Sequence, residues 1–109
     1  MELTKNSKKL ICLLYKDYLK KRKAGLSKTI SNSFGSSHNI HERLCPNWIF
    51  EDVDNTCREL SRAGMLNCLW ADDIACLVQI SDSGIIYMEN RSKNGLLGVI
   101  KFISEFKPW

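Results

Sequence analysis

The stretch CRELSRAGML, residues 57–66, decides the fold of this chain because the spacing of its apolar residues changes within it. Cys57 and Leu60 continue a helical spacing, and Gly64 is the residue type that most often follows a helix end. From Leu66 onward, apolar residues alternate with others, as they do in a half-buried strand. The stretch therefore predicts the end of an amphipathic helix and the start of a β-strand.

The helix that ends here lies within residues 46–64, PNWIFEDVDNTCRELSRAG. Asn47 is a candidate N-cap, and acidic residues occupy the first turns, where the helix dipole favours them. Val53, Cys57 and Leu60 form the apolar stripe, which we expect to face the core.

The opposite side of this helix carries candidate recognition residues. Asn55, Arg58 and Arg62 point outward at i, i+3 and i+7 when the apolar stripe faces inward. Asn side chains suit the edge of adenine, and Arg side chains suit the edge of guanine. The alternative is an ordinary salt-bridged surface, in which Asp54 pairs with Arg58 and Glu59 pairs with Arg62.

Two alternating segments then predict a short β-hairpin. Its apolar residues are Leu66, Cys68, Trp70, Ile74, Cys76, Val78 and Ile80. A three-residue turn, Ala71–Asp73, would put the apolar sets of both strands on one face, whereas a two-residue turn would not. In that register Cys68 lies opposite Cys76.

The N-terminal part of the chain predicts a helix over residues 5–23, with Gly25 as its stop. Its apolar stripe is Ile11, Leu14, Tyr15 and Tyr18. Its opposite side carries a ridge of lysines, namely Lys9, Lys16, Lys20 and Lys23. Residues 1–28 hold nine Lys or Arg against two Asp or Glu, whereas residues 29–109 hold seven against ten. The ridge is therefore either a contact for nucleic-acid phosphates or a solvated helix face.

Two short helices are expected between these two longer ones. The first lies within residues 26–34, with Ser27 as its cap and with Ile30 and Phe34 facing inward. The second begins at Ser36 or Ser37 and ends at Leu44, because Pro46 prevents its continuation.

The C-terminal part predicts a helix that starts at Ser81 or Asp82, carries Ile85, Ile86 and Met88, and ends near residues 93–95. A further apolar segment, LLGVIKFISEF, spans residues 96–106. We expect residues 1–109 to form a single domain, in which residues 94–109 pack on the first helix or form a dimer interface.

The cysteines are odd in number and form no C-x-x-C pair, so the sequence favours free, structural thiols and a cytosolic location. We expect no signal peptide, because the apolar run LICLLY is too short, and no membrane span.

The order of the expected elements resembles the winged helix-turn-helix domain. The resemblance rests on CRELSRAGML, on the hairpin through Ile80, and on ISDSGIIYME, which is similar to the L-T-x-x-G-x-x-Y segment that follows the wing in many such proteins. It covers roughly residues 5–93. The chain is also similar to the small YjcQ-like winged-helix proteins of Gram-positive bacteria and their prophages.

This resemblance implies a recognition helix over roughly residues 50–63, which enters the major groove, and a wing over residues 66–80. Two features depart from the family pattern. The wing tip is Asp72–Asp73, which phosphate would repel. The recognition helix also carries four acidic residues, namely Glu51, Asp52, Asp54 and Glu59.

Other kinds of site find little support in the sequence. His38, His41 and Cys45 share a helix face at i, i+3 and i+7, but a structural zinc site needs a fourth ligand and none is evident nearby. The common catalytic and nucleotide-binding motifs are missing. We therefore expect no enzyme activity, no cofactor and no metal.

The sequence thus predicts an α+β, mostly helical protein: a winged helix-turn-helix with a two-stranded wing and an extra C-terminal helical segment. We expect a small cytoplasmic DNA-binding protein that acts as a homodimeric transcriptional regulator, without identifying an effector. The alternative is a protein-interaction module that keeps the winged-helix shape without binding DNA.

Overall fold

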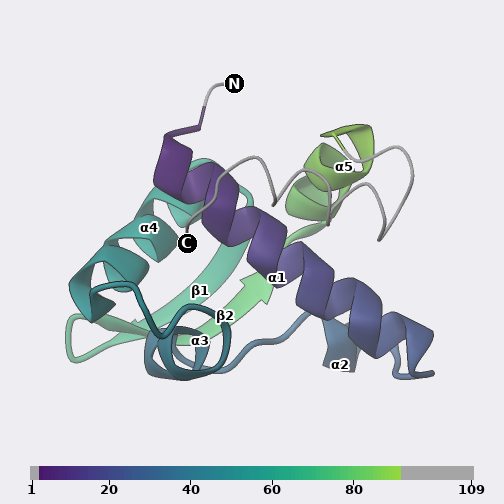
Figure 1. Ribbon diagram of the computed structural model, residues 1–109, viewed down its shortest axis with the longest axis horizontal. Coiled ribbons are helices and arrows are strands. Elements are labelled where there is room, and N and C mark those ends of the chain that lie inside the picture. Colours follow the sequence, from purple (N-terminus) through teal and green to yellow (C-terminus); the bar gives the residue numbers. More distant parts are fainter. Residues whose placement is uncertain (1–2, 92–109) are drawn as a thin grey trace.

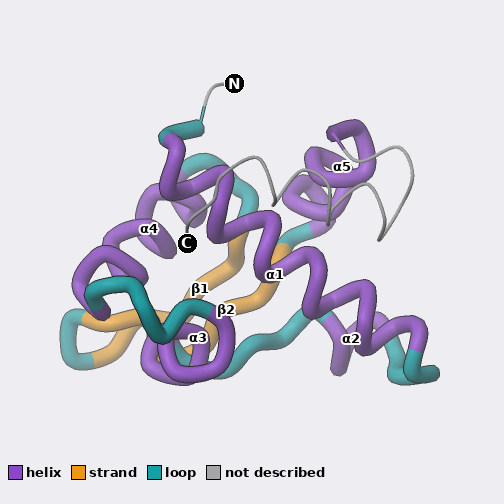
Figure 2. Tube along the Cα trace, viewed as in Figure 1, coloured by secondary structure: helices purple, strands orange, loops and turns teal. Residues whose placement is uncertain are grey.

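The computed structural model describes residues 3–91 of the chain. The elements are α1 (Lys5–Lys23), α2 (Lys28–Ser31), α3 (Ser37–Leu44), α4 (Phe50–Arg62), β1 (Leu66–Ala71), β2 (Ile74–Ile80) and α5 (Asp82–Arg91). Figures 1 and 2 show that α1 crosses in front of the hairpin, with α4 on one side of it and α5 on the other. The described chain is α+β and mostly helical, as the sequence predicts.

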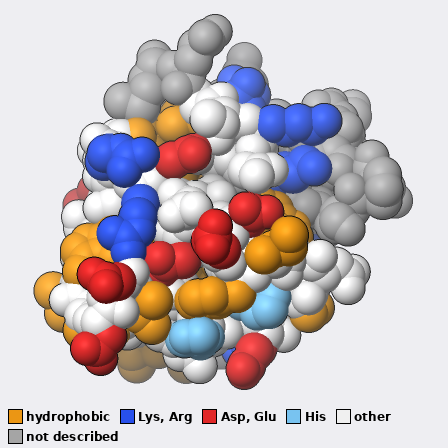
Figure 3. Space-filling view, turned by 90° about the vertical axis from the view of Figure 1, so that its left-hand side faces the viewer, with side chains coloured by type: hydrophobic (Ala, Val, Ile, Leu, Met, Phe, Trp, Pro, Cys, Tyr) orange, Lys and Arg blue, Asp and Glu red, His pale blue; other side chains and the backbone are white. Residues whose placement is uncertain are grey.

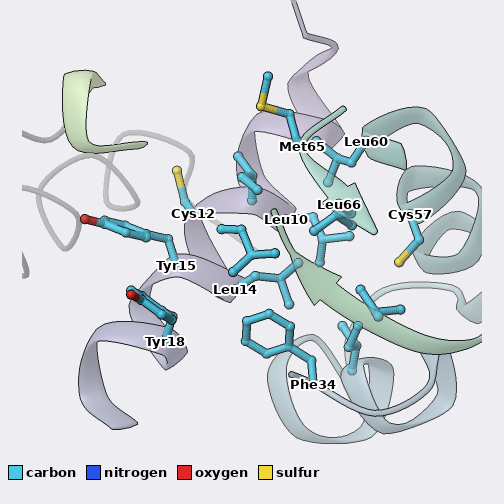
Figure 4. Close-up of a cluster of buried hydrophobic side chains, with 14 of the residues drawn as sticks. Leu10, Cys12, Leu14, Tyr15, Tyr18, Phe34, Cys57, Leu60, Met65 and Leu66 are labelled. Carbon is cyan, nitrogen blue, oxygen red and sulfur yellow. The ribbon is translucent and has the colours of Figure 1, made fainter. Parts of the chain in front are cut away.

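The core lies where α1, α4 and the hairpin meet (Figure 4). The predicted stripes of both long helices are buried, namely Ile11, Leu14, Tyr15 and Tyr18 of α1 and Val53, Cys57 and Leu60 of α4. They are joined by Leu66, Val78 and Ile80 from the strands and by Phe34 from the loop before α3. Burial of such side chains contributes most of the stabilisation.

Two glycines end the long helices as predicted. Gly64 has φ +79°, and the Met65 N–H donates to the Leu60 carbonyl at 2.9 Å, which is the 6→1 bond of a Schellman motif. Gly25 ends α1 with φ +93° and the same bonding pattern. Because this backbone conformation suits glycine, the sequence signal was specific.

The predicted cap of α4 is wrong. Asn47 lies in a turn in which the Trp48 N–H donates to the Cys45 carbonyl. The residue at the N-cap position is Ile49, which makes no side-chain cap bond, and α4 begins at Phe50. The start of α4 is therefore favoured by the acidic residues of its first turn rather than by a capping side chain.

The second short helix follows the prediction, and the first follows it only in part. Ser27 caps α2 and Ser36 caps α3, which ends at Leu44. Phe34 is buried, but the expectation for Ile30 is wrong because this side chain is 58% exposed. Helix α2 lasts only one turn, and that turn directs Ser31 inward instead.

The predicted three-residue turn of the hairpin is also wrong. Ala71 pairs directly with Ile74, so the turn has two residues, Asp72 and Asp73. Both have positive φ, 52° and 65°, as the central residues of a type I′ turn do. Aspartate tolerates this left-handed conformation better than most residues.

A bulge in β2 replaces the missing turn residue. Leu69 pairs with Leu77 and Trp70 pairs with Ala75, which leaves Cys76 without a partner on β1. This extra residue shifts the alternation of β2 by one position. The inward residues of both strands therefore share one face although the turn is short.

The bulge changes two further expectations. Cys68 lies opposite Val78, not opposite Cys76, and Cys76 is exposed. Trp70 lies opposite the buried Ala75, and its position beside the hairpin tip leaves it 40% exposed.

The loop between α2 and α3 adds a third, strand-like segment to the hairpin. The Phe34 N–H donates to the Val78 carbonyl at 2.9 Å, and the Val78 N–H donates to the Gly35 carbonyl at 2.7 Å. Ser33 forms an isolated bridge with Gln79. The outer edge of β2 is therefore paired, an arrangement that the sequence did not indicate.

Helix α5 begins at Asp82, and the Ser81 hydroxyl accepts a hydrogen bond from the Gly84 N–H at 3.0 Å, as expected for a cap. Ile85 and Met88 are buried, but Ile86 is 55% exposed. The predicted end of this helix near residues 93–95 and the segment 94–109 lie outside the described residues. None of the helices within residues 3–91 is long and apolar enough to cross a membrane.

Candidate nucleic-acid interface

The predicted recognition residues occupy the outer side of α4. Asn55 and Arg62 are exposed, and the Arg58 side chain is 36% exposed. Figure 3 looks onto the side of the molecule where α4 and the hairpin tip lie. Lys and Arg side chains gather mainly in its upper half, while acidic, histidine and hydrophobic side chains share the lower half (Figure 3). This face therefore has mixed charge.

Arg58 links α4 to the hairpin tip. Its Nη2 lies 3.3 Å from Asp54 Oδ2 and donates to the Asp73 carbonyl. Its guanidinium carbon lies 4.5 Å from the centre of the Trp70 ring, as in a cation–π contact. The predicted pair between Asp54 and Arg58 is present, and two further contacts fix the guanidinium group in one orientation.

Asp54 is the buried anchor of this arrangement, with 6% of its surface exposed. Its Oδ1 accepts hydrogen bonds from the Ser37 hydroxyl at 2.9 Å and from the Ala75 N–H at 3.0 Å. One carboxylate therefore connects α3, α4 and β2 while its other oxygen pairs with Arg58. Buried carboxylates need such partners to offset the loss of hydration.

Sequence reasoning missed this buried role of Asp54. The sequence placed Asp54 among the acidic residues of the first turns and as a surface partner of Arg58. Its spacing could have revealed this role. Asp54 lies three positions before the core residue Cys57, and residues at i and i+3 lie on the same side of a helix.

Glu59 has different partners from those predicted. Its Oε2 accepts hydrogen bonds from Thr4 Oγ1 and from Ser7 Oγ, both at 2.8 Å. These bonds tie the start of α1 to α4, and they direct the carboxylate toward α1 rather than toward Arg62. Glu59 is therefore part of the helix–helix contact, and the exposed acidic residues of α4 are Glu51 and Asp52 near its start.

The hairpin tip is acidic, as the sequence indicated. Asp72 and Asp73 are both exposed, and the nearby Leu69 is 61% exposed. Two adjacent carboxylates repel phosphate, so this tip cannot supply the phosphate contact that a basic wing makes.

The lysine ridge belongs to a different helix from the recognition residues. Lys20 and Lys23 are exposed and Lys9 and Lys16 are half-buried, all on the side of α1 opposite its core stripe. The lysines therefore do not lie on the same helix as Asn55, Arg58 and Arg62. Lys16 and Lys20 instead meet Arg43 of α3 around a small cavity.

The residues weighed as metal ligands have other contacts. The His38 ring stacks on Phe50 with centroids 4.0 Å apart, and His41 Nε2 lies 2.7 Å from the Trp48 carbonyl oxygen. The Cys45 thiol lies 3.7 Å from the Ile40 carbonyl oxygen. Within residues 3–91, no group of three or more His, Cys, Asp or Glu is placed to hold a metal ion.

The thiols are free, and all but one are at least partly shielded from solvent. Burial raises the pKa of Cys12 to about 12, and it raises the pKa of Cys45 and of Cys68 to about 11. Burial also raises the pKa of Cys57 above its ordinary value. The exception to the expected apolar placement is Cys76, which the bulge leaves exposed.

Comparisons of the chain with family models, with characterised proteins and with solved structures gave no match. A function for this surface must therefore be inferred from its side chains and their partners.

Proposed function

We propose that this chain is a winged-helix domain that binds double-stranded DNA. Helices α3 and α4 would be the helix-turn-helix, and the β1–β2 hairpin would be the wing. The order of elements supports this proposal: a long helix, a one-turn helix, a strand-like segment, two helices and a hairpin whose second strand pairs with that segment. In this arrangement α4 is the recognition helix.

The observation that carries the proposal is the fixed position of Arg58. Both of its hydrogen bonds come from Nη2, so the remaining donors of a partly exposed guanidinium group are left to face a ligand. A side chain held in place loses little conformational entropy on binding. Arginine held in this way suits the O6 and N7 atoms of guanine.

In the proposed complex, Asn55 reads adenine and Arg58 and Arg62 read guanine in the major groove. The lysines of α1, Lys9, Lys16, Lys20 and Lys23, supply attraction to phosphate that carries no sequence information. We further propose that the protein acts in the cytoplasm as a homodimeric, non-catalytic regulator of transcription, in keeping with its free thiols.

The hairpin tip favours a second candidate, a module that binds another protein. Asp72 and Asp73 place negative charge beside the exposed side chain of Leu69. Exposed apolar groups rimmed by charge are typical of protein contacts. In this case the mixed face of α4 would contact a protein with basic and apolar groups.

Selection of preferred sites from a random duplex library tests the first candidate. Wild-type protein should enrich sites that contain guanine at a fixed position, and Arg58→Ala should lose that preference while keeping its affinity for random duplex. Arg22→Ala removes the same charge from α1 and should leave the preference unchanged. Identical selected sites for wild type and Arg58→Ala would remove Arg58 from DNA reading.

A further inference from the structure

A basic cavity lies between α1 and the end of α3, away from the outer residues of α4. Its volume is about 160 Å³. It is lined by Leu13, Lys16, Asp17, Lys20, Arg43 and Leu44. Three of these six side chains are cationic, one is anionic and two are apolar.

The carboxylate that lines the cavity, Asp17, has its charge neutralised by a lysine outside the cavity. Asp17 Oδ2 lies 3.0 Å from Lys21 Nζ and 3.6 Å from Arg43 Nη2. Lys21 does not line the cavity, and its Nζ also donates to the Ser33 carbonyl at 2.8 Å and lies over the Phe34 ring. Lys21 therefore neutralises Asp17 while Lys16, Lys20 and Arg43 keep a surplus of positive charge.

Asp17 also positions the arginine. The contact between its carboxylate and Arg43 draws the guanidinium group toward α1, while the Arg43 side chain remains 46% exposed. An arginine can bind two oxygens of one anion at once, whereas lysines act as point charges around it. The cavity thus combines one fork-shaped donor with two ammonium groups and the apolar side chains of Leu13 and Leu44.

We propose that this cavity binds a phosphate group. Its volume is below that of pockets for drug-sized ligands, so it fits a group rather than a whole large molecule. A phosphate monoester carries a charge of about −1.5 to −2 near neutral pH, which matches the surplus of cations better than a singly charged carboxylate does. Leu13 and Leu44 would contact the carbon atoms next to the phosphate.

The charge argument favours a small phosphate monoester, and the other source of a phosphate group is the singly charged backbone phosphate of a nucleic acid. Both would use Lys20 and Arg43. Lys16 and Lys20 also belong to the lysines proposed to attract DNA phosphate, so the backbone source rests on the proposed function, whereas binding of a monoester does not.

The test titrates the folded full chain with glycerol 3-phosphate, and separately with a short random DNA duplex, at constant ionic strength. Binding is followed by calorimetry for the first probe and by fluorescence anisotropy for the second. Lys20→Gln and Arg43→Gln remove lining cations, and Lys5→Gln removes an exposed cation of α1 outside the cavity. The exposed Lys20 keeps the test informative if Arg43→Gln weakens the contact between the helices.

For a monoester, we expect saturable binding of glycerol 3-phosphate that each lining substitution weakens about tenfold, while Lys5→Gln has little effect. For a backbone phosphate, glycerol 3-phosphate does not bind, and both lining substitutions weaken duplex binding by more than Lys5→Gln does. The phosphate site is ruled out if Lys20→Gln and Arg43→Gln weaken the binding of both probes by no more than Lys5→Gln does.

Discussion

Helices α1 and α4 have similar inner sides and different outer sides. Each buries an apolar stripe in the same core, and each contributes a fully buried cysteine, Cys12 or Cys57. The outer side of α1 is dominated by lysines, whereas the outer side of α4 mixes acidic residues with Asn55, Arg58 and Arg62. In the proposed DNA complex, attraction to phosphate and selection among sequences would therefore belong to different helices.

The polar residues of α4 differ from the lysines of α1 because several of them contact neighbouring elements. Asp54 binds α3 and β2, Arg58 binds the hairpin tip, and Glu59 binds α1. Such residues can be positioned precisely for recognition, but they also cost stability when they are removed. Substitutions on the two helices separate these two effects.

The largest expected effect is that of Asp54→Ala. This change leaves the Ala75 N–H buried without an acceptor, and it leaves the Ser37 hydroxyl with only the Ala75 carbonyl oxygen at 3.3 Å. Arg58 also loses its carboxylate partner, so the free energy of unfolding should fall by about 2–5 kcal/mol. Urea denaturation measures the loss.

Asp52→Ala is the matched control on the same helix. Asp52 is exposed in the first turn, so its removal should cost at most about 1 kcal/mol through the helix dipole. Equal losses for the two variants would show that Asp54 is an ordinary surface charge and that the anchor described above has no energetic role.

The buried thiols of α1 and α4 should make the stability of the fold depend on pH in the same way. The thiols of Cys12 and Cys57 have raised pKa values in the folded state, because burial disfavours the thiolate. The unfolded chain therefore releases protons near pH 9 that the folded chain keeps, so stability should fall as the pH rises above this value. Each buried thiol should contribute about 1 kcal/mol of loss between pH 9 and pH 10.

Denaturation curves at pH 8, 9 and 10 measure this loss, and Cys12→Ser and Cys57→Ser should each reduce it relative to wild type. At pH 8, thiol reagents should label the exposed Cys76 quickly and the thiols of both helices only after unfolding. Rapid labelling of Cys12 or Cys57 in the native protein would contradict their equal burial.

The lysines of α1 should affect DNA binding without affecting selectivity. Lys9→Gln and Lys23→Gln should each lower the salt slope of binding by about 0.9, with the same relative loss on selected and random duplexes. A loss confined to one selected sequence would assign base reading to α1 and remove the division between the helices.

The smallest effect is expected at the hairpin tip. The double substitution Asp72→Asn and Asp73→Asn removes two charges, and asparagine also tolerates the positive φ of both positions. Binding to random duplex should rise severalfold if the tip faces DNA, as measured by anisotropy. Weaker binding to DNA would show that the carboxylates themselves make favourable contacts in the complex.

The sequence predicts what depends on local periodicity. The bounds of α1 and α3, the inward stripes of α1 and α4 and the glycine stops were correct, because each depends on neighbouring residues along one helix. The hairpin shows where this reasoning ends. The alternation of apolar residues showed that one extra residue must lie between the paired positions of the two strands, but it did not show where. In the structure this residue is Cys76, in a bulge of β2 rather than in the turn.

The candidate site depended more on long-range contacts. The sequence found the outward positions of Asn55, Arg58 and Arg62 and the pair of Arg58 with Asp54. It could not find the contacts of Arg58 with the hairpin tip, because these join positions 12 or more residues apart that only the folded chain brings together.

The central claim is that α4 and the hairpin form a DNA-binding surface assisted by the lysines of α1. Its most direct test is the affinity of wild-type protein for random duplex DNA between 50 and 200 mM salt. Four lysine contacts to phosphate predict a log–log slope of about −3.6, which is a loss of roughly 100-fold over this range. No binding at 50 mM salt would contradict the claim and would leave the protein-binding module as the function of this surface.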